Sequence, residues 1–237
     1  MISIRYFPPD WGFGNRILFY NNLRQRAEKD GVSWSCIPWK GSEHFSSITP
    51  GHVSGGVSLQ PCLGEKFFEW HTVSTRDIFK FSGVKECLTT KDKVRAAVHF
   101  RGGDFHQWNI DAVLKTDYYI ESIKLIENEV DEFLIFTDDE SLDSYNNVEV
   151  YFEDKNIKYD IGDNVRSNYI NDFKLMTTCD YIISSPSTYN ICAGFIGKHK
   201  KIIHSKEWID NRVNANDKFW VDLSNGGNTD YSIWRLV

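Results

Sequence analysis

The chain has 237 residues, which exceeds the ~100–150 residues of a usual single domain and predicts one large folded unit or two modest ones. Aromatic residues make up 15% of it, with eight Trp and sixteen Phe, and this content favours a packed globular protein over a disordered one. The formal net charge of −6 argues against a general nucleic-acid binder, which needs a basic face to neutralise phosphates.

The cysteines and the lengths of the apolar runs argue against further classes of protein. The five cysteines are widely spaced, odd in number and lack a C-x-x-C pair, so they favour neither a disulfide framework nor a zinc site. No stretch approaches the roughly 20 apolar residues of a membrane-spanning helix, and no basic segment followed by a long apolar one opens the chain. We therefore expect an unprocessed cytoplasmic protein without a transmembrane segment.

The first part of the chain predicts a strand, a helix and a second strand. The strand runs from Ile2 to Phe7, and residues 8–14 form a glycine-bearing loop. A helix follows from about Asn15, and Val32 to Pro38 resembles a second strand. Helical periodicity places one set of apolar residues on the buried side of this helix: Phe13, Ile17, Tyr20, Leu23 and Ala27.

The segment from Trp39 to Gly64 is rich in Gly, Ser and His and shows no sustained period. Irregular segments of this length are commonly binding loops, so this one is a candidate to hold a second substrate. Phe67 to Phe81 regains helical character, and Lys91 to Lys93 reads as a linker. We place a boundary near Lys91, which divides the chain into residues 1–91 and 92–237.

The second part alternates strands and helices. Strands are expected to end at Arg101 and to span Phe133–Phe136, Val148–Phe152, Tyr181–Ile183 and Ile202–His204. Helices are expected after a cap at Thr116 and Asp117, around Tyr169–Met176, and through Phe195. This alternation, with near-continuous apolar strands, predicts an α/β fold with a parallel sheet covered by helices on both faces.

Polar groups follow three of these predicted strands. In open α/β sheets ligands sit beyond the carboxyl ends of the strands, so we expect the three sets to line one crevice. The sets are Arg101 with Asp104, Asp138 with Asp139, and Ser187 with Thr188.

These residue types suit a nucleoside diphosphate. A guanidinium such as that of Arg101 grips a phosphate through two parallel hydrogen bonds. The turn from Ser184 to Thr188 leads into a helix, whose positive N-terminus is a natural seat for phosphate. The aspartates suit ribose hydroxyls or the ring N–H groups of a purine.

Simpler roles stay open for several of these residues. Arg101 and Asp104 can form a local salt bridge around a turn. One of Asp138 and Asp139 would contact a nucleoside while the other caps a helix, because adjacent side chains point apart. Asn15 can serve only as the cap of the first helix.

Four segments resemble the alpha-1,2-fucosyltransferase family, within a superfamily that includes alpha-1,6- and protein O-fucosyltransferases. They are Phe13-Gly-Asn-Arg16, His99-Phe-Arg-Gly-Gly-Asp104, Phe133-Leu-Ile-Phe-Thr-Asp-Asp139, and Asn171 to Thr188 with its Ser-Ser-Pro-Ser-Thr ending. Their order and spacing match the family. The similarity covers most of the chain and is sharp only in these segments.

The resemblance implies a GT-B fold, in which two Rossmann-like halves face each other across a cleft. It implies GDP-fucose as donor, held mainly by the C-terminal half, a glycan acceptor, and no metal or other cofactor. In the family pattern the motif histidine contacts guanine and the motif arginine contacts the β-phosphate, here His99 and Arg101. The remaining donor contacts would be Asp138 and Asp139 for the nucleoside, Ser187 and Thr188 for phosphate, and Gly14, Asn15 and Arg16 from the N-terminal half.

The chain also departs from the family. The usual second arginine of the motif is Gly102, and the family's Phe-Ser-Trp-Trp-Gly stretch becomes Tyr189-Asn-Ile-Cys-Ala-Gly194. A donor of another kind, such as UDP- or dTDP-rhamnose, therefore stays open. So does a nucleotide- or sugar-binding module without catalysis.

If the protein is a glycosyltransferase, the resemblance implies inversion at the anomeric carbon. Negative charge then grows on the β-phosphate, where Arg101 would stabilise it, and Asp104 is the second catalytic candidate. The base for the acceptor hydroxyl is unassigned among four candidates: Asp10, Glu43, Asp104 and His106.

Overall fold

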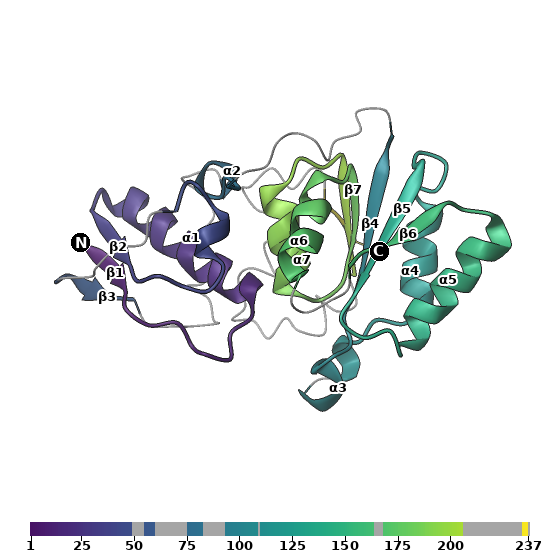
Figure 1. Ribbon diagram of the computed structural model, residues 1–237, viewed down its shortest axis with the longest axis horizontal. Coiled ribbons are helices and arrows are strands. Elements are labelled where there is room, and N and C mark those ends of the chain that lie inside the picture. The colour runs from purple at the N-terminus through teal and green to yellow at the C-terminus, as the bar shows by residue number, and fades with distance from the viewer. Residues whose placement is uncertain are drawn as a thin grey trace. The chain divides into compact units, whose positions relative to one another are not determined.

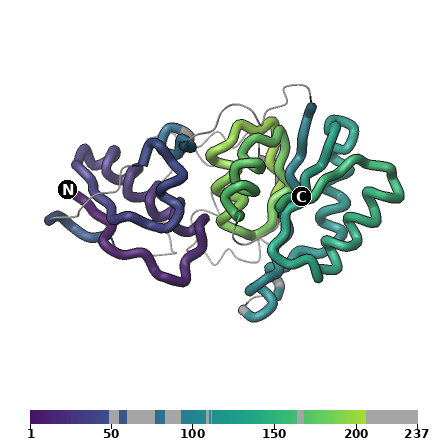
Figure 2. The backbone as a smooth tube through the Cα atoms, in the orientation of Figure 1, coloured from purple at the N-terminus to yellow at the C-terminus, as the bar shows by residue number. Residues whose placement is uncertain are grey.

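The computed structural model describes residues 1–48, 55–59, 75–82, 93–108, 110–163, 168–205 and 234–236. The described residues up to 82 belong to one compact unit and those from 93 onward to another. Figure 2 follows the two units along the chain, from purple and blue to teal and green. The predicted boundary at Lys91 lies outside the described residues.

The N-terminal unit contains a small parallel sheet. Strand β1 (Ile2–Ile4) lies between β2 (Trp34–Cys36) and β3 (Val57–Ser58), and both pairings are parallel. The first two strands are shorter than predicted, and β3 falls within the segment predicted to be irregular. A one-turn 3-10 helix η1 (Ser42–His44) and a short helix α2 (Thr75–Ile78) complete the described elements of this unit.

Helix α1 (Phe13–Asp30) connects β1 to β2. Its predicted apolar side is confirmed at Ile17, Tyr20, Leu23 and Ala27, which are buried, whereas Phe13 is half-buried. The helix ends at Asp30 and is capped by Gly31, whose φ of 60° is a left-handed conformation that glycine adopts without a steric penalty.

The C-terminal unit is built on one larger sheet. Its strands are β4 (Arg95–Phe100), β5 (Glu132–Thr137), β6 (Tyr159–Ile161), β7 (Tyr181–Ser184), β8 (Lys201–His204) and β9 (Trp234–Leu236). They lie side by side in the order β6-β5-β4-β7-β8-β9, and every pairing is parallel. Counted within the unit, this is the 3-2-1-4-5-6 order of the Rossmann-like doubly wound sheet, which confirms the predicted α/β class.

Helices cover both faces of this sheet (Figure 1). Helices α4 (Thr116–Lys124) and α5 (Asp143–Lys155) lie on one face, and α6 (Tyr169–Thr178) and α7 (Thr188–Ile196) lie on the other. A short helix α3 (Phe105–Trp108) and a 3-10 turn η2 (Ile110–Ala112) follow β4. Every second residue of β4 packs toward α4 and α5, in a core that includes Ala96, Val98, Phe100, Tyr119, Ile123, Val148 and Phe152.

Two local predictions were wrong, and one strand was not predicted. Residues Val148–Phe152 lie inside α5 and not in a strand, because Val148 and Phe152 are four residues apart and share a buried helix face while Val150 is exposed. Helix α4 is preceded by Lys115 at its N-cap position, so the Thr116 and Asp117 pair lies within the helix. A further strand, β9, which the sequence analysis does not include, pairs with β8.

Within the described ranges, no helix combines the length and the apolar character that crossing a membrane requires.

Candidate functional site

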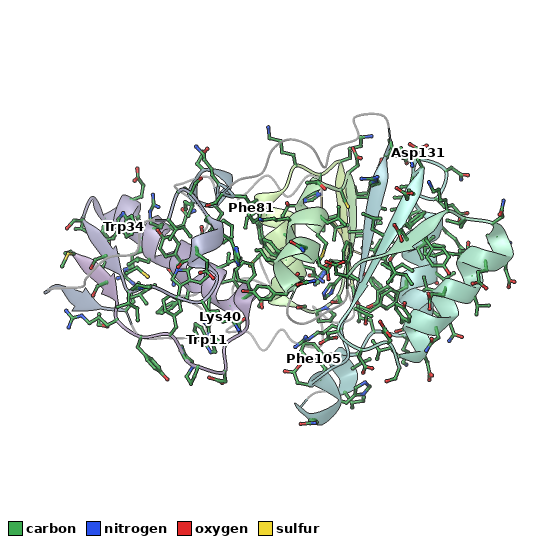
Figure 3. The ribbon with its side chains drawn as sticks, viewed as in Figure 1. Trp11, Trp34, Lys40, Phe81, Phe105 and Asp131 are labelled. Atoms are coloured by element: carbon green, nitrogen blue, oxygen red, sulfur yellow. The ribbon has the colours of Figure 1, made fainter. Side chains whose placement is uncertain are left out.

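The candidate site lies at the carboxyl end of the C-terminal sheet, around β4 and β7. These strands are neighbours, yet the chain continues from β4 to β5 on one side and from β7 to β8 on the other. Figure 3 marks the two ends of the sheet: Phe105 lies just beyond β4 at the site, and Asp131 precedes β5 at the opposite end. Ligands of doubly wound sheets bind at this topological switch point.

Arg101 is held by two carboxylates. One terminal nitrogen, Nη1, donates to Asp138, and the other, Nη2, donates to Asp104. Its guanidinium carbon also lies 5.0 Å from the centre of the Phe105 ring. The local salt bridge with Asp104 is therefore present, and the sheet brings Asp138 to the same cation from the neighbouring strand end.

The two glycines after Arg101 let the chain pass close to both aspartates. The Gly102 amide donates to Asp138 Oδ1 at 3.0 Å, and Gly103 has a left-handed φ of 30°. A Cβ atom on Gly102 would lie 2.6 Å from Leu142 Cδ2 and 2.8 Å from Asp139 Oδ2, which is closer than packed atoms tolerate. The position where the resemblance expects a second arginine thus has no room for a side chain unless its neighbours move.

Asp139 contacts a different set of residues from Asp138. Its Oδ1 accepts hydrogen bonds from the backbone N of Ser141 at 3.0 Å and from the Ser141 hydroxyl at 2.5 Å. Its Oδ2 lies 3.2 Å from Nε2 of His106 on α3. The Ser141 hydrogen bonds, with a smaller contribution from His106, hold the pKa of Asp139 below its ordinary value against the opposing effect of burial.

The prediction that one of the two aspartates caps a helix was wrong. The cap position of α5 is Leu142, with no side-chain cap, and Asp139 instead closes a turn on Ser141. The Thr137 hydroxyl fixes the same turn, since it accepts from the Asp139 amide at 3.0 Å.

His99 is buried in a polar network beneath the site. Its Nδ1 lies 2.7 Å from the Ser185 hydroxyl and 2.8 Å from the amide nitrogen of Asn190 on α7. Burial, and secondarily the Arg101 charge, lower the pKa of His99 to about 3, so the ring is neutral near pH 7.

The network has a direction that fixes the tautomer of His99. The Asn190 amide nitrogen donates to the Ser185 carbonyl at 3.1 Å, which sets the orientation of the amide and makes His99 Nδ1 an acceptor. The proton of the neutral ring therefore resides on Nε2. Asn190 Oδ1 accepts from Ser184, whose hydroxyl oxygen lies 3.0 Å from Nδ1 of the buried His204.

Ser187 and Thr188 stand where β7 gives way to α7. Ser187 is the N-cap residue, and its hydroxyl accepts from the Tyr189 amide at 3.3 Å; Thr188 is the first helical residue. The expected turn from a strand into a helix N-terminus is confirmed. In this structure, however, the Ser187 hydroxyl caps α7.

The N-terminal candidates lie at the start of α1. Gly14 is buried, and Asn15 lies in the first turn and is not the cap, a position taken by Gly12. Arg16 donates from Nε to the Trp11 carbonyl at 2.8 Å and from Nη2 to the Pro9 carbonyl at 3.3 Å. Arg16 therefore stabilises the glycine-bearing loop that precedes α1.

The sequence does not predict two members of the site, Asn190 and His204. It offers His106 as a candidate base without its link to Asp139, and Ser185 only as part of the turn from Ser184 to Thr188. A polar Asn190 beside the apolar Ile191 to Ala193 run, and a histidine ending the Ile202-Ile203 strand, were the available signals. Neither signal identifies a partner until the sheet order is known.

Among the residues in the described ranges, no group of three or more His, Cys, Asp or Glu side chains is arranged to hold a metal ion. Comparison with protein-family models, with curated proteins and with solved structures finds no match to this chain.

Proposed function

We propose that this protein is an inverting glycosyltransferase that moves a 6-deoxyhexose, fucose from GDP-fucose, onto a glycan hydroxyl without a metal ion. The observation that carries the proposal is the position of Arg101, at the carboxyl end of β4 and beside the switch point of a doubly wound sheet. The fucosyltransferase-like motif around Arg101 supplies the identity of the donor.

The electrostatics of this sheet end favour a bound diphosphate. Helix α7 begins at Thr188, after the strand adjacent to β4, so its positive N-terminus shares the sheet end with Arg101. A phosphate there would exchange the carboxylates of Asp104 and Asp138 for its own oxygens on Arg101, keeping two parallel hydrogen bonds. Arg101 would then stabilise the charge that develops on the leaving diphosphate.

Asp138, from the acidic pair of the motif, and His99 would bind the nucleoside. His99 has its proton on Nε2, so this atom is a donor suited to an acceptor atom of a base or a phosphate. A carboxylate released from Arg101 accepts hydrogen bonds from ribose hydroxyls or from purine N–H groups. These roles follow the family pattern for the motif histidine and the acidic pair.

The N-terminal unit would supply the acceptor side in a GT-B arrangement. The Arg16 contacts with Trp11 and Pro9 shape the loop that carries the Gly-Asn-Arg segment. We propose that this loop faces the donor when both substrates are bound.

A binding module without catalysis is the second candidate, and one observation favours it. Arg101 is the sole arginine of the motif and is shared by two carboxylates, which lowers its net attraction for a diphosphate. Such a module would bind GDP and GDP-fucose but would not consume the donor.

Calorimetric titration with GDP, UDP and dTDP, followed by measurement of GDP release from GDP-fucose, tests the proposal. We expect GDP to bind most tightly and GDP-fucose to be consumed, faster with a suitable glycan acceptor. Binding without consumption would assign the module, a preference for UDP or dTDP would change the donor, and the absence of nucleotide binding would refute the proposal.

A further inference from the structure

We infer that His106 is the catalytic base of the proposed transfer and that Asp139 is the residue that positions it. The inference rests on the proposed function and selects one of four base candidates that the sequence leaves open. It follows from how each candidate is engaged in the structure.

Two of the candidates are already engaged elsewhere. Asp104 is paired with Arg101, so its charge is committed to the residue proposed to bind the diphosphate. Glu43, in the N-terminal unit, accepts from the Gly41 amide at 2.9 Å and stands 3.8 Å from His44. Asp10 is exposed in the loop before α1, and no hydrogen bond or ion pair is found for its side chain among the described residues.

His106 differs because a fixed acceptor orients its ring. Its Nε2 lies 3.2 Å from Asp139 Oδ2, and the Asp139 carboxylate is itself anchored through Oδ1 by Ser141. The lowered pKa of Asp139 keeps it ionised near neutral pH, and an ionised carboxylate only accepts hydrogen bonds. In the neutral ring the proton therefore resides on Nε2, and Nδ1 carries the lone pair.

The His106 ring is accessible and belongs to the element that follows β4. Its side chain is 44% exposed, so a small hydroxyl can reach the ring from solvent. The carboxylate that holds it lies against Gly102, the residue after Arg101, and adjoins Asp138, which pairs with Arg101. The charged group in contact with the ring is thus Asp139, and the ion pairs of Arg101 with Asp104 and Asp138 belong to the same strand end.

The pair performs a balanced proton transfer. The acceptor hydroxyl gives its proton to His106 Nδ1 while its oxygen forms a bond to the anomeric carbon of the donor. The bond from that carbon to the β-phosphate oxygen breaks, and its electron pair leaves with the diphosphate. His106 becomes an imidazolium beside the Asp139 carboxylate and afterwards returns the proton to water.

Water and azide as competing nucleophiles test the base without knowledge of the natural acceptor. Water must lose a proton when it attacks GDP-fucose, whereas the azide anion needs no base. We expect His106→Gln to slow hydrolysis by about a hundredfold or more, the usual contribution of a general base, and to match the wild type with azide. GDP affinity should stay within about twofold, and Gln107→Ala, an exposed neighbour on α3, should change none of these rates.

Asp139→Asn separates positioning from structure. Ser141 donates to Oδ1, so the amide nitrogen of Asn would face His106 and turn its Nε2 into an acceptor, which places the proton on Nδ1. We expect this variant to lose hydrolysis and to keep the azide reaction, as His106→Gln does. A destabilised fold would instead slow both reactions.

Each outcome decides the inference. Wild-type hydrolysis in His106→Gln would overturn the role of His106 while leaving the transferase intact. A parallel loss of GDP affinity and of the azide reaction would make His106 a phosphate ligand and also overturn it. If the wild-type protein neither binds GDP nor consumes GDP-fucose, the proposed function fails and the inference fails with it.

Discussion

The proposed function depends on Arg101. Its two ion pairs determine what an anionic ligand must displace in order to bind. Its two terminal nitrogens are paired with Asp104 and Asp138. A diphosphate must compete with both carboxylates. Arg101 is thus held in place before a ligand arrives, and part of the binding energy is offset by the two ion pairs that break.

This competition predicts the effect of Asp104→Asn on binding. Asp104 is 58% exposed, and exposed ion pairs contribute about 0.2–1 kcal/mol, so removing its charge should tighten GDP binding by up to about fivefold. Isothermal titration calorimetry at low salt measures the change, with the exposed Glu121→Gln on α4 as a control. Weaker GDP binding in Asp104→Asn would show that Asp104 helps Arg101 to bind rather than competing for it.

The pairing of Arg101 with Asp104 can be predicted from the sequence, whereas its pairing with Asp138 cannot. Arg101 and Asp104 are three residues apart across a glycine turn, so their local salt bridge is visible from spacing alone. Asp138 and Asp139 could be identified as residues at a strand end, but not assigned to partners. Only the pairing of β4 with β5 shows that Asp138 meets Arg101 while Asp139 meets His106.

At the scale of elements, the network beneath the site connects β4, β7, α7 and β8. Asn190 is its centre, since its amide links His99 to Ser184 and Ser185. Buried polar groups that lose their partners cost about 1–3 kcal/mol each. The position of His99, and with it the end of β4, therefore depends on a helix that lies ninety residues further along the chain.

Replacing Asn190 should destabilise the C-terminal unit. Asn190→Ala leaves His99 and Ser184 without these hydrogen bonds, and we expect the free energy of unfolding to fall by about 2–4 kcal/mol. Urea denaturation followed by circular dichroism measures this loss. Asn146→Ala removes amide bonds to the Glu140 and Leu142 carbonyls from an exposed residue and should cost about 0.5 kcal/mol, so equal losses in the two variants would refute the importance of the network.

The incorrect prediction of a strand at Val148–Phe152 has a physical cause. The Val148–Phe152 segment is short and apolar, and such runs fit a strand or a buried helix face until flanking residues are considered. Tyr145 precedes Val148 by three residues and is also buried, which completes a helical stripe on α5. The apolar run that ends at Arg101, by contrast, is correctly predicted as a strand, with Val98 and Phe100 in the core against α4 and α5.

At the scale of the whole molecule, the described chain forms two units, and each unit is built on one parallel sheet. The predicted α/β class follows from alternation of elements, because parallel strands need long crossover connections. The order of the strands does not follow from it, since the sequence does not state on which side of β4 each later strand is added. The switch point, and hence the site, becomes visible only with that order.

Two buried histidines predict how the stability of the protein depends on pH. Burial lowers the pKa of both His99 and His204 to about 3, whereas an unfolded histidine has a pKa of about 6.5. Between these values the unfolded chain binds protons that the folded chain excludes. The associated stability is fully present above about pH 6.5 and is lost as the pH falls toward 3.

We therefore expect the free energy of unfolding to fall by roughly 1.4 kcal/mol per pH unit for each histidine below about pH 6. Urea denaturation between pH 7 and pH 5 measures the slope, in a range above the ordinary titration of carboxylates. His204→Gln should reduce the slope by about half. A slope close to zero in the wild-type protein would contradict the burial of neutral histidines.

The most direct test of the nucleotide site is calorimetric titration of GDP into the wild-type protein and Arg101→Ala. Arg95→Ala is the matched control, because Arg95 begins the same strand at its opposite end and its partner Glu132 still contacts Lys93 and Lys158. We predict GDP binding in the wild type and in Arg95→Ala, and a loss of affinity of about tenfold to a hundredfold in Arg101→Ala, because hydrogen bonds to charged groups contribute about 1.5–3 kcal/mol. Equal GDP affinity in all three proteins, or no binding to any of them, would contradict the nucleotide site proposed at the end of β4.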